Sequence, residues 1–178
     1  TIPPLNNNQW LNVFNDYKLS PEFLYVNKNM TLDEFKYIFW WEWFHRFFAR
    51  LIGLVFIIPF IYFLVKKNLN SFFYKRFSII FSLGLLQALV GWWMVKSGLS
   101  ENPYVSPYRL TFHLSNAVII YALLLWTSIE YYHLKKTNFI NIKSKNVFIL
   151  ISIILVFITI LSGGFMAGSH AGQSFNTY

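Results

Sequence analysis

Four long stretches without a charged side chain constrain this sequence more than any other feature. They cover residues 51–65, 77–95, 110–129 and 147–166. About 20 helical residues cross the hydrocarbon core of a bilayer, and an α-helix satisfies its own backbone hydrogen bonds in lipid. The pattern therefore predicts an all-α fold, a polytopic membrane helix bundle in which this chain supplies four transmembrane helices.

Composition supports this class and excludes others. The 178 residues are 56% hydrophobic and only 12% charged, which is typical of a membrane protein. The net charge of +8 comes from basic residues clustered between the apolar stretches, as in membrane topology, so a nucleic-acid partner is not expected. The absence of cysteine excludes disulfides, iron–sulfur clusters and thiolate metal sites within the sequence.

The first membrane helix is expected to begin well before its uncharged part. Thr31 followed by Glu34 matches a capping box, in which each side chain can bond the backbone N–H of the other residue, so the helix should start near Leu32. It should stop at Lys66, and Pro59 is expected to kink it without ending it, as membrane helices tolerate.

Residues 1–30 contain Pro3, Pro4, Pro21 and several Asn, and they show no sustained hydrophobic period. They are predicted to form a loop at the outer face of the membrane. Because the sequence starts at Thr1 and stops in a Gly-rich stretch, we expect it to be a piece of a longer chain. No signal peptide is visible.

Basic residues set the expected orientation of the helices. Segments 66–76 and 133–145 are rich in Lys and Arg, whereas the segment between the second and third helices carries only Lys96 and Glu101. The positive-inside rule then places both basic segments inside and both chain ends outside.

A cluster of ionisable residues stands in the aromatic stretch WWEWFHRFFAR, residues 40–50, which leads into the first apolar run. Positions three and four apart are neighbours on a helix. The residues predicted to share one side of this helix are Glu42, His45, Arg46, Ala49 and Gly53.

A second histidine, His113, is predicted at the same depth as His45. His45 stands 21 residues before Lys66, and His113 stands 22 residues before Lys135. Both imidazoles should therefore lie about 31 to 33 Å from the inner basic boundary. His113 is expected to share its side of the third helix with Arg109, Asn116 and Ala117.

Two histidines at one height on helices that run in the same direction can ligate one metal from opposite sides. This indicates a planar metallo-cofactor such as haem, with His45 and His113 as axial ligands of the iron. Arg46, Arg50 and Arg109 would then pair with the haem propionates.

The pattern alone leaves a plainer interpretation open. An intramembrane histidine can be a hydrogen-bond partner between helices, and Glu42 can simply neutralise Arg46. Small or polar residues on one side of the second helix favour helix packing over a ligand face, and these are Gly84, Gln87, Ala88 and Gly91. His133 fits an aromatic interface, and His170 is given no role.

The sequence resembles the haem A synthase family in four stretches that follow one another at compatible spacing. They are EFKYIFWWEWFHRFFARLIG (34–53), LLQALVGWWMVKSGL (85–99), VSPYRLTFHLSNA (105–117) and SGGFMAGSHAGQSFNTY (162–178). Together they cover most of the chain beyond the first 30 residues. Some members of the family carry a cysteine pair in the outer loops, and this chain departs from them in having none.

The resemblance implies an eight-span protein of two four-helix bundles, of which this chain holds spans two to five. Residues 31–135 would belong to the first bundle, and 136–178 would be an inner loop and the first span of the second bundle. In the first bundle His45 and His113 would ligate the substrate, haem O. The second bundle would hold a haem b cofactor whose ligands lie outside this chain.

The activity implied is oxidation of one haem O methyl group to a formyl group by successive hydroxylations, giving haem A for terminal cytochrome oxidase. Glu42, in the motif Glu-x-x-His with His45, would be the catalytic residue. The isolated 178-residue piece would be inactive, because the second haem is missing.

Other expectations follow from the resemblance or stay open beside it. The protein should be an oxidoreductase of the bacterial or mitochondrial inner membrane, surrounded by lipid. A haem O synthase partner and a homo-oligomer stay open. The alternative functions are a bis-histidine membrane cytochrome acting only in electron transfer and a structural or transporter-like subunit without haem.

Overall fold

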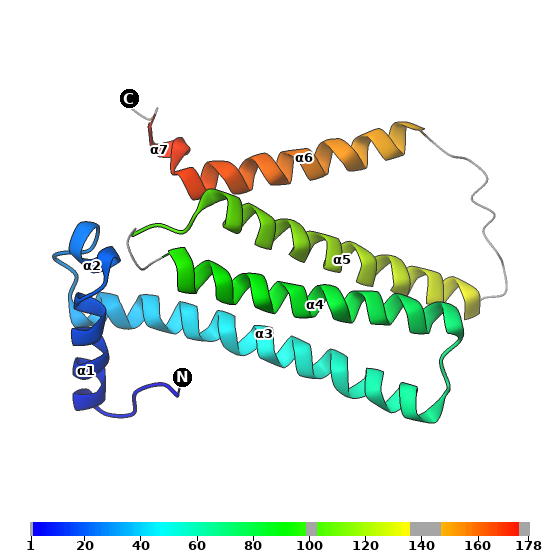
Figure 1. Cartoon of the computed structure of the whole chain (residues 1–178), viewed down its shortest axis with the longest axis horizontal. Helices are drawn as coiled ribbons and strands as arrows, with labels where there is room; N and C mark the ends of the chain where they lie inside the picture. The colour runs from blue at the N-terminus through cyan, green and yellow to red at the C-terminus, as the bar shows by residue number, and fades with distance from the viewer. Residues whose placement is uncertain (1, 99–102, 136–146, 175–178) are drawn as a thin grey trace. The chain divides into compact units, whose positions relative to one another are not determined.

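Every regular element in the described part of the chain is a helix. A computed structural model describes residues 2–98, 103–135 and 147–174. Helices α3 to α6 are each long and apolar enough to cross a membrane, so the predicted four-span, all-α membrane architecture is confirmed. The elements in chain order (Figure 1) are α1 (Asn7–Lys18), α2 (Pro21–Tyr25), α3 (Leu32–Lys66), α4 (Ser71–Gly98), α5 (Pro107–Lys135), α6 (Val147–Ser169) and α7 (Ala171–Ser174).

The chain divides into two compact units, and each is described by itself. The first comprises residues 1–68 and 95–104, and the second comprises residues 69–94 and 105–178. The first unit therefore holds α1, α2 and α3. Most of α4 belongs to the second unit, together with α5, α6 and α7.

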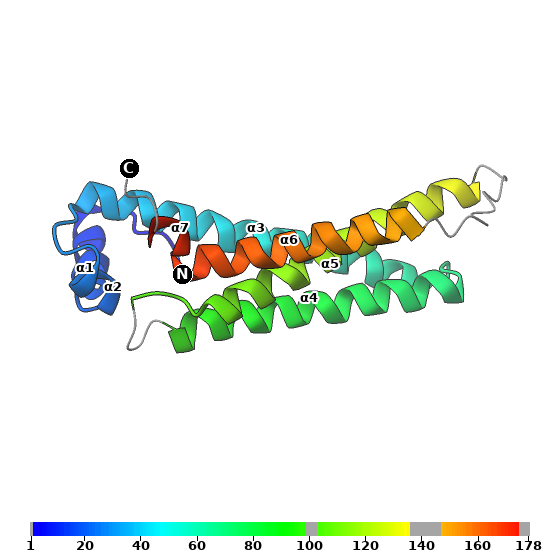
Figure 2. The same cartoon turned by 90° about the horizontal axis from the view of Figure 1, so that it is seen from above.

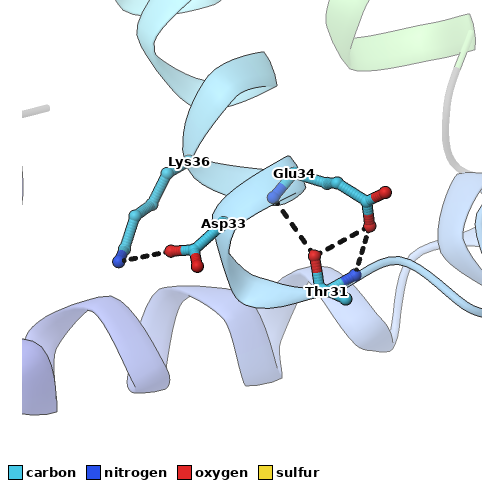
Figure 3. A network of polar contacts seen from close by, with 4 residues as sticks. All are labelled: Thr31, Asp33, Glu34 and Lys36. Atoms are coloured by element: carbon cyan, nitrogen blue, oxygen red, sulfur yellow. Dashed lines mark hydrogen bonds and ion pairs between the residues drawn. The ribbon is translucent and has the colours of Figure 1, made fainter.

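Helix α3 starts at the predicted capping box. Thr31 donates from its backbone N and from Oγ1 to Glu34 Oε2, at 2.7 and 2.8 Å, and Glu34 N donates back to Thr31 Oγ1 at 3.4 Å. Figure 3 shows this exchange beside the ion pair of Lys36 with Asp33. The helix runs unbroken through Pro59 to Lys66, so the prediction that Pro59 does not end it is confirmed.

The prediction that residues 1–30 form a loop is wrong, because two helices lie there. Asn6 caps α1 by accepting from Gln9 N at 2.9 Å, and Ser20 caps α2. The apolar positions on α1 do follow a helical period of three and four, and the many Asn residues, which are poor helix formers, obscured it. These positions are Trp10, Val13, Phe14 and Tyr17.

Aromatic packing holds the N-terminal helices on the start of α3. Trp10 and Phe14 are buried against Phe35, and the Phe14 and Phe35 ring centroids lie 5.2 Å apart. In both views α1 crosses the first turns of α3 (Figures 1 and 2). This cluster of large side chains gives residues 7–35 a core of their own.

The helices are longer than the uncharged stretches that predicted them. Lys75 and Arg76 lie in the first turns of α4, where a loop was expected, and α4 extends to Gly98. Long basic side chains can leave the bilayer while their backbone stays helical, which explains the difference. The expected inner segment is partly outside the described residues, which resume at Val147 after Lys135.

In the second unit α4, α5 and α6 run side by side in both views (Figures 1 and 2). At the basic ends of α4 and α5, Arg76 Nη1 lies 3.2 Å from Glu130 Oε2. The rings of Phe73 and Tyr131 pack edge to face beside this ion pair, with centroids 5.7 Å apart. These contacts join the two helices at the end opposite to His113.

Two buried glycines on α6 bring it close to α5. A Cβ built on Gly168 would lie 2.7 Å from Pro107 Cα, and one built on Gly164 would lie 3.0 Å from Thr111 Oγ1. Small residues four apart allow this kind of approach between membrane helices. The glycine pair therefore sets the distance between the two helices.

We expect Gly168→Ala to destabilise the protein by about 1 to 3 kcal/mol, because the new methyl group would overlap backbone of α5. Gly163→Ala is the matched control, since a Cβ there meets nothing within 4 Å. Thermal unfolding of both variants in detergent measures the difference. Equal melting temperatures for the two variants would contradict the packing described here.

The predicted orientation can be tested because the sequence contains no cysteine. Cysteines introduced at Asn68, after α3, and at Asn141, which lies outside the described residues, should react only with a membrane-permeant thiol reagent. A cysteine at Asn8 on α1 should also react with an impermeant reagent in intact spheroplasts. Labelling of Asn68→Cys by the impermeant reagent would show that the orientation is the reverse of the predicted one.

Candidate functional site

The predicted ionisable face of α3 exists, because the helix is continuous from Leu32 to Lys66. Arg46 Nη2 donates to Glu42 Oε1 one turn earlier, so the two form an ion pair, and both side chains are about half exposed. His45 and Arg50 are exposed on the same helix. Glu42 and Arg46 thus act as one charged pair beside His45.

His113 on α5 is held by side chains of α4 and α5. Its Nε2 lies 3.2 Å from Gln87 Nε2. Gln87 Oε1 accepts from Asn116 Nδ2 at 2.8 Å, and the same Asn116 nitrogen donates to the backbone oxygen of Leu83 at 3.0 Å. Asn116 is buried. A chain of polar contacts therefore runs from the α4 backbone to the imidazole.

Gly91 completes the surroundings of the imidazole. A Cβ built on Gly91 would lie 3.0 Å from His113 Cε1, so even a methyl group there would crowd the ring and force a small shift. Leu83, Gln87 and Gly91 follow one another at intervals of four residues and present one face of α4 to α5. The expected close helix contact on this side of α4 is confirmed at Gly91, whereas a Cβ on Gly84 would meet nothing within 4 Å.

Arg109 lies one turn before His113 and is also engaged with α4. Its guanidinium carbon is 4.6 Å from the centroid of the Trp93 ring, a cation–π distance. The contact anchors the Arg109 guanidinium against α4.

The partners of His113 were not predicted from the sequence. Gln87 and Asn116 were placed on the correct helix faces but were not paired with the histidine. Because polar groups on facing membrane helices need hydrogen-bond partners, their polarity could have indicated this pairing. His45 and His113 belong to different units, so their joint ligation of one metal stays a prediction.

A bare metal ion and a haem require different sets of protein ligands. Within residues 2–98, 103–135 and 147–174, no three side chains of His, Cys, Asp or Glu gather to hold an ion. A porphyrin supplies four equatorial nitrogens and needs only axial ligands from the protein. Gly91 and Gln87 contact the His113 imidazole and hold it in one orientation.

Comparison with known proteins places the chain among close relatives. The family model COX15-CtaA, described as cytochrome oxidase assembly protein, matches residues 1–178. A protein named Heme A synthase from Nitrosomonas eutropha is 45% identical over 181 residues, which is 100% of this chain and 51% of the relative. Proteins of the same name from Nitrosospira multiformis and Flavobacterium psychrophilum are 46% and 43% identical, over 51% and 52% of their lengths.

The match covers all or nearly all of this chain in each case. The chain spans about half the length of the curated relatives it matches. No solved structure matches it significantly.

Proposed function

Since this chain belongs to the cytochrome oxidase assembly protein family COX15-CtaA, we propose that the full protein converts haem O into haem A. The observation that carries the proposal is the similarity, over the whole chain, to relatives named Heme A synthase. The residues expected to act lie within the matched region, on helices α3 and α5.

In this proposal His45 and His113 are the axial ligands of the haem O iron. The surroundings of His113 support the assignment in one respect, because Gln87 and Gly91 hold the imidazole in one orientation, with Nε2 facing the Gln87 amide that haem would have to displace. His45 is exposed on α3, where no tight packing hides it. Arg46, Arg50 and Arg109 are proposed to bind the haem propionates, and Arg109 is partly held by Trp93.

Glu42 is proposed as the catalytic residue. Each of two hydroxylations would replace a methyl C–H bond with C–OH, releasing protons and two electrons that would leave through the haem b of the second bundle, and the resulting gem-diol loses water to leave a formyl group. A carboxylate one turn from His45 can accept the protons released or stabilise positive charge that develops near the ring edge. Arg46 holds this carboxylate by its ion pair and so fixes where it acts.

The remaining parts of the proposal come from the family resemblance. A haem b cofactor in a second bundle would be held by histidines that lie outside this chain. A haem O synthase is a candidate supplier of substrate. Homo-oligomers are also compatible with the exposed apolar surface of α3 to α6, which lipid otherwise covers.

The test is extraction of haem from the full-length protein after expression in cells that make haem O. Chromatography should show haem O together with haem A. Recovery of haem b alone would favour the alternative, a bis-histidine cytochrome that only transfers electrons. A preparation without any haem would favour a structural subunit.

A further inference from the structure

Which atom donates in the contact between Gln87 and His113 follows from the hydrogen bonds that connect Gln87 to the α4 backbone. The oxygen of Leu83 can only accept, so the Asn116 atom 3.0 Å from it must be the amide nitrogen. That nitrogen also faces Gln87 at 2.8 Å, so the Gln87 atom there must be the oxygen. The Gln87 amide nitrogen therefore points to His113.

This order also fixes the tautomer of His113. An amide nitrogen is a donor only, so His113 Nε2, 3.2 Å away, must accept and carries a lone pair. In a neutral imidazole the proton is then on Nδ1. The lone pair that an iron atom needs is present and is occupied by the Gln87 amide.

Iron and the Gln87 amide compete for the same lone pair of Nε2. A synthase must bind its substrate haem and release its product haem in every turnover, so its bonds to iron must break easily. We propose that Gln87 is a positioning residue that caps His113 Nε2 when haem leaves, and so lowers the affinity of this site for haem. This inference rests on the proposed function, because it takes His113 as an iron ligand.

Residues of α4 and α5 keep the imidazole in place during this exchange. Gly91 leaves room for Cε1, and Asn116 holds the Gln87 amide from the other side. Nε2 can therefore exchange the Gln87 amide for iron while the imidazole ring stays in place. Without the cap, release of haem would leave Nε2 of this partly buried imidazole without the partner that Gln87 supplies.

The test is a titration of haem O into the full-length protein freed of haem. Gln87→Met keeps the length of the side chain and removes the amide, so it should lower the dissociation constant about fivefold, the factor that corresponds to one net hydrogen bond. Asn116→Leu removes the group that orients Gln87 and should act in the same direction. Ser82→Ala is the control on α4, since that hydroxyl bonds only Ser78 O of its own helix in the described contacts.

The direction in which the dissociation constant for haem O changes distinguishes the proposal from a role in packing alone. If Gln87 merely supports the shape of the site, both variants should bind haem O more weakly than the wild type. Weaker binding would overturn the proposal, and so would a dissociation constant that Gln87→Met does not change.

A second measurement needs no haem. Nitrogen-15 NMR of the haem-free, histidine-labelled protein should show His113, identified by its absence in His113→Ala, protonated on Nδ1. Gln87→Met should move part of the population to the Nε2-protonated form. An unchanged tautomer would overturn the proposal, whereas a His113→Ala variant with unaltered haem binding would overturn the ligand assignment in the proposed function.

Discussion

Full-length protein carrying His113→Ala should lose the low-spin haem O bound in the first bundle. The proposal gives this iron two imidazole ligands, and alanine at position 113 has no side-chain atom that could ligate it. Changing an outer partner of a metal ligand typically alters affinity by 10- to 100-fold, so removing the ligand itself should weaken haem O binding by more than about 100-fold. Haem content and the low-spin signal in electron paramagnetic resonance measure the loss.

His45→Ala should have the same effect, because both imidazoles are needed for a low-spin iron. The control is His170→Asn, which removes a histidine from a position with φ of 53°. Asparagine tolerates this left-handed conformation, so the substitution should preserve the fold and the spectrum. If His170→Asn abolishes the signal while His113→Ala keeps it, the ligand assignment is wrong.

Glu42→Gln should separate binding from chemistry. The amide keeps the shape of the carboxyl group but cannot accept a proton, so we expect haem O to be retained while formation of haem A falls by about 10² to 10⁴-fold. Chromatography of haem extracted from the full-length variant measures both quantities in one experiment.

The control for Glu42→Gln is Asp33→Asn on the same helix. Asp33 also forms an ion pair, with Lys36 at 3.0 Å, but it lies near the start of α3 and away from His45. Its replacement should leave haem A formation unchanged. Loss of bound haem in Glu42→Gln would show that Glu42 maintains the fold or the haem site. Normal amounts of haem A would show that Glu42 is not needed for the reaction.

The sequence by itself determined the features that depend on residues close together along the chain. The Thr31 and Glu34 capping box and the face that joins Glu42 to Arg46 follow from spacings of three or four residues along one helix. The unbroken helix through Pro59 follows from the tolerance of membrane helices for proline. The four spans follow from the length of the apolar stretches. Their exact ends did not, since basic side chains continue a helix that hydropathy alone would stop.

Only the tertiary structure decided which faces meet. The pairing of Gln87 with His113 and the close approach of Gly168 to Pro107 join positions far apart in the sequence. Such contacts depend on how each helix is rotated about its axis and shifted along it. Apolar stretches that are hydrophobic on all sides carry little information about rotation, so the sequence predicted the helices and the three-dimensional packing of side chains selected their partners.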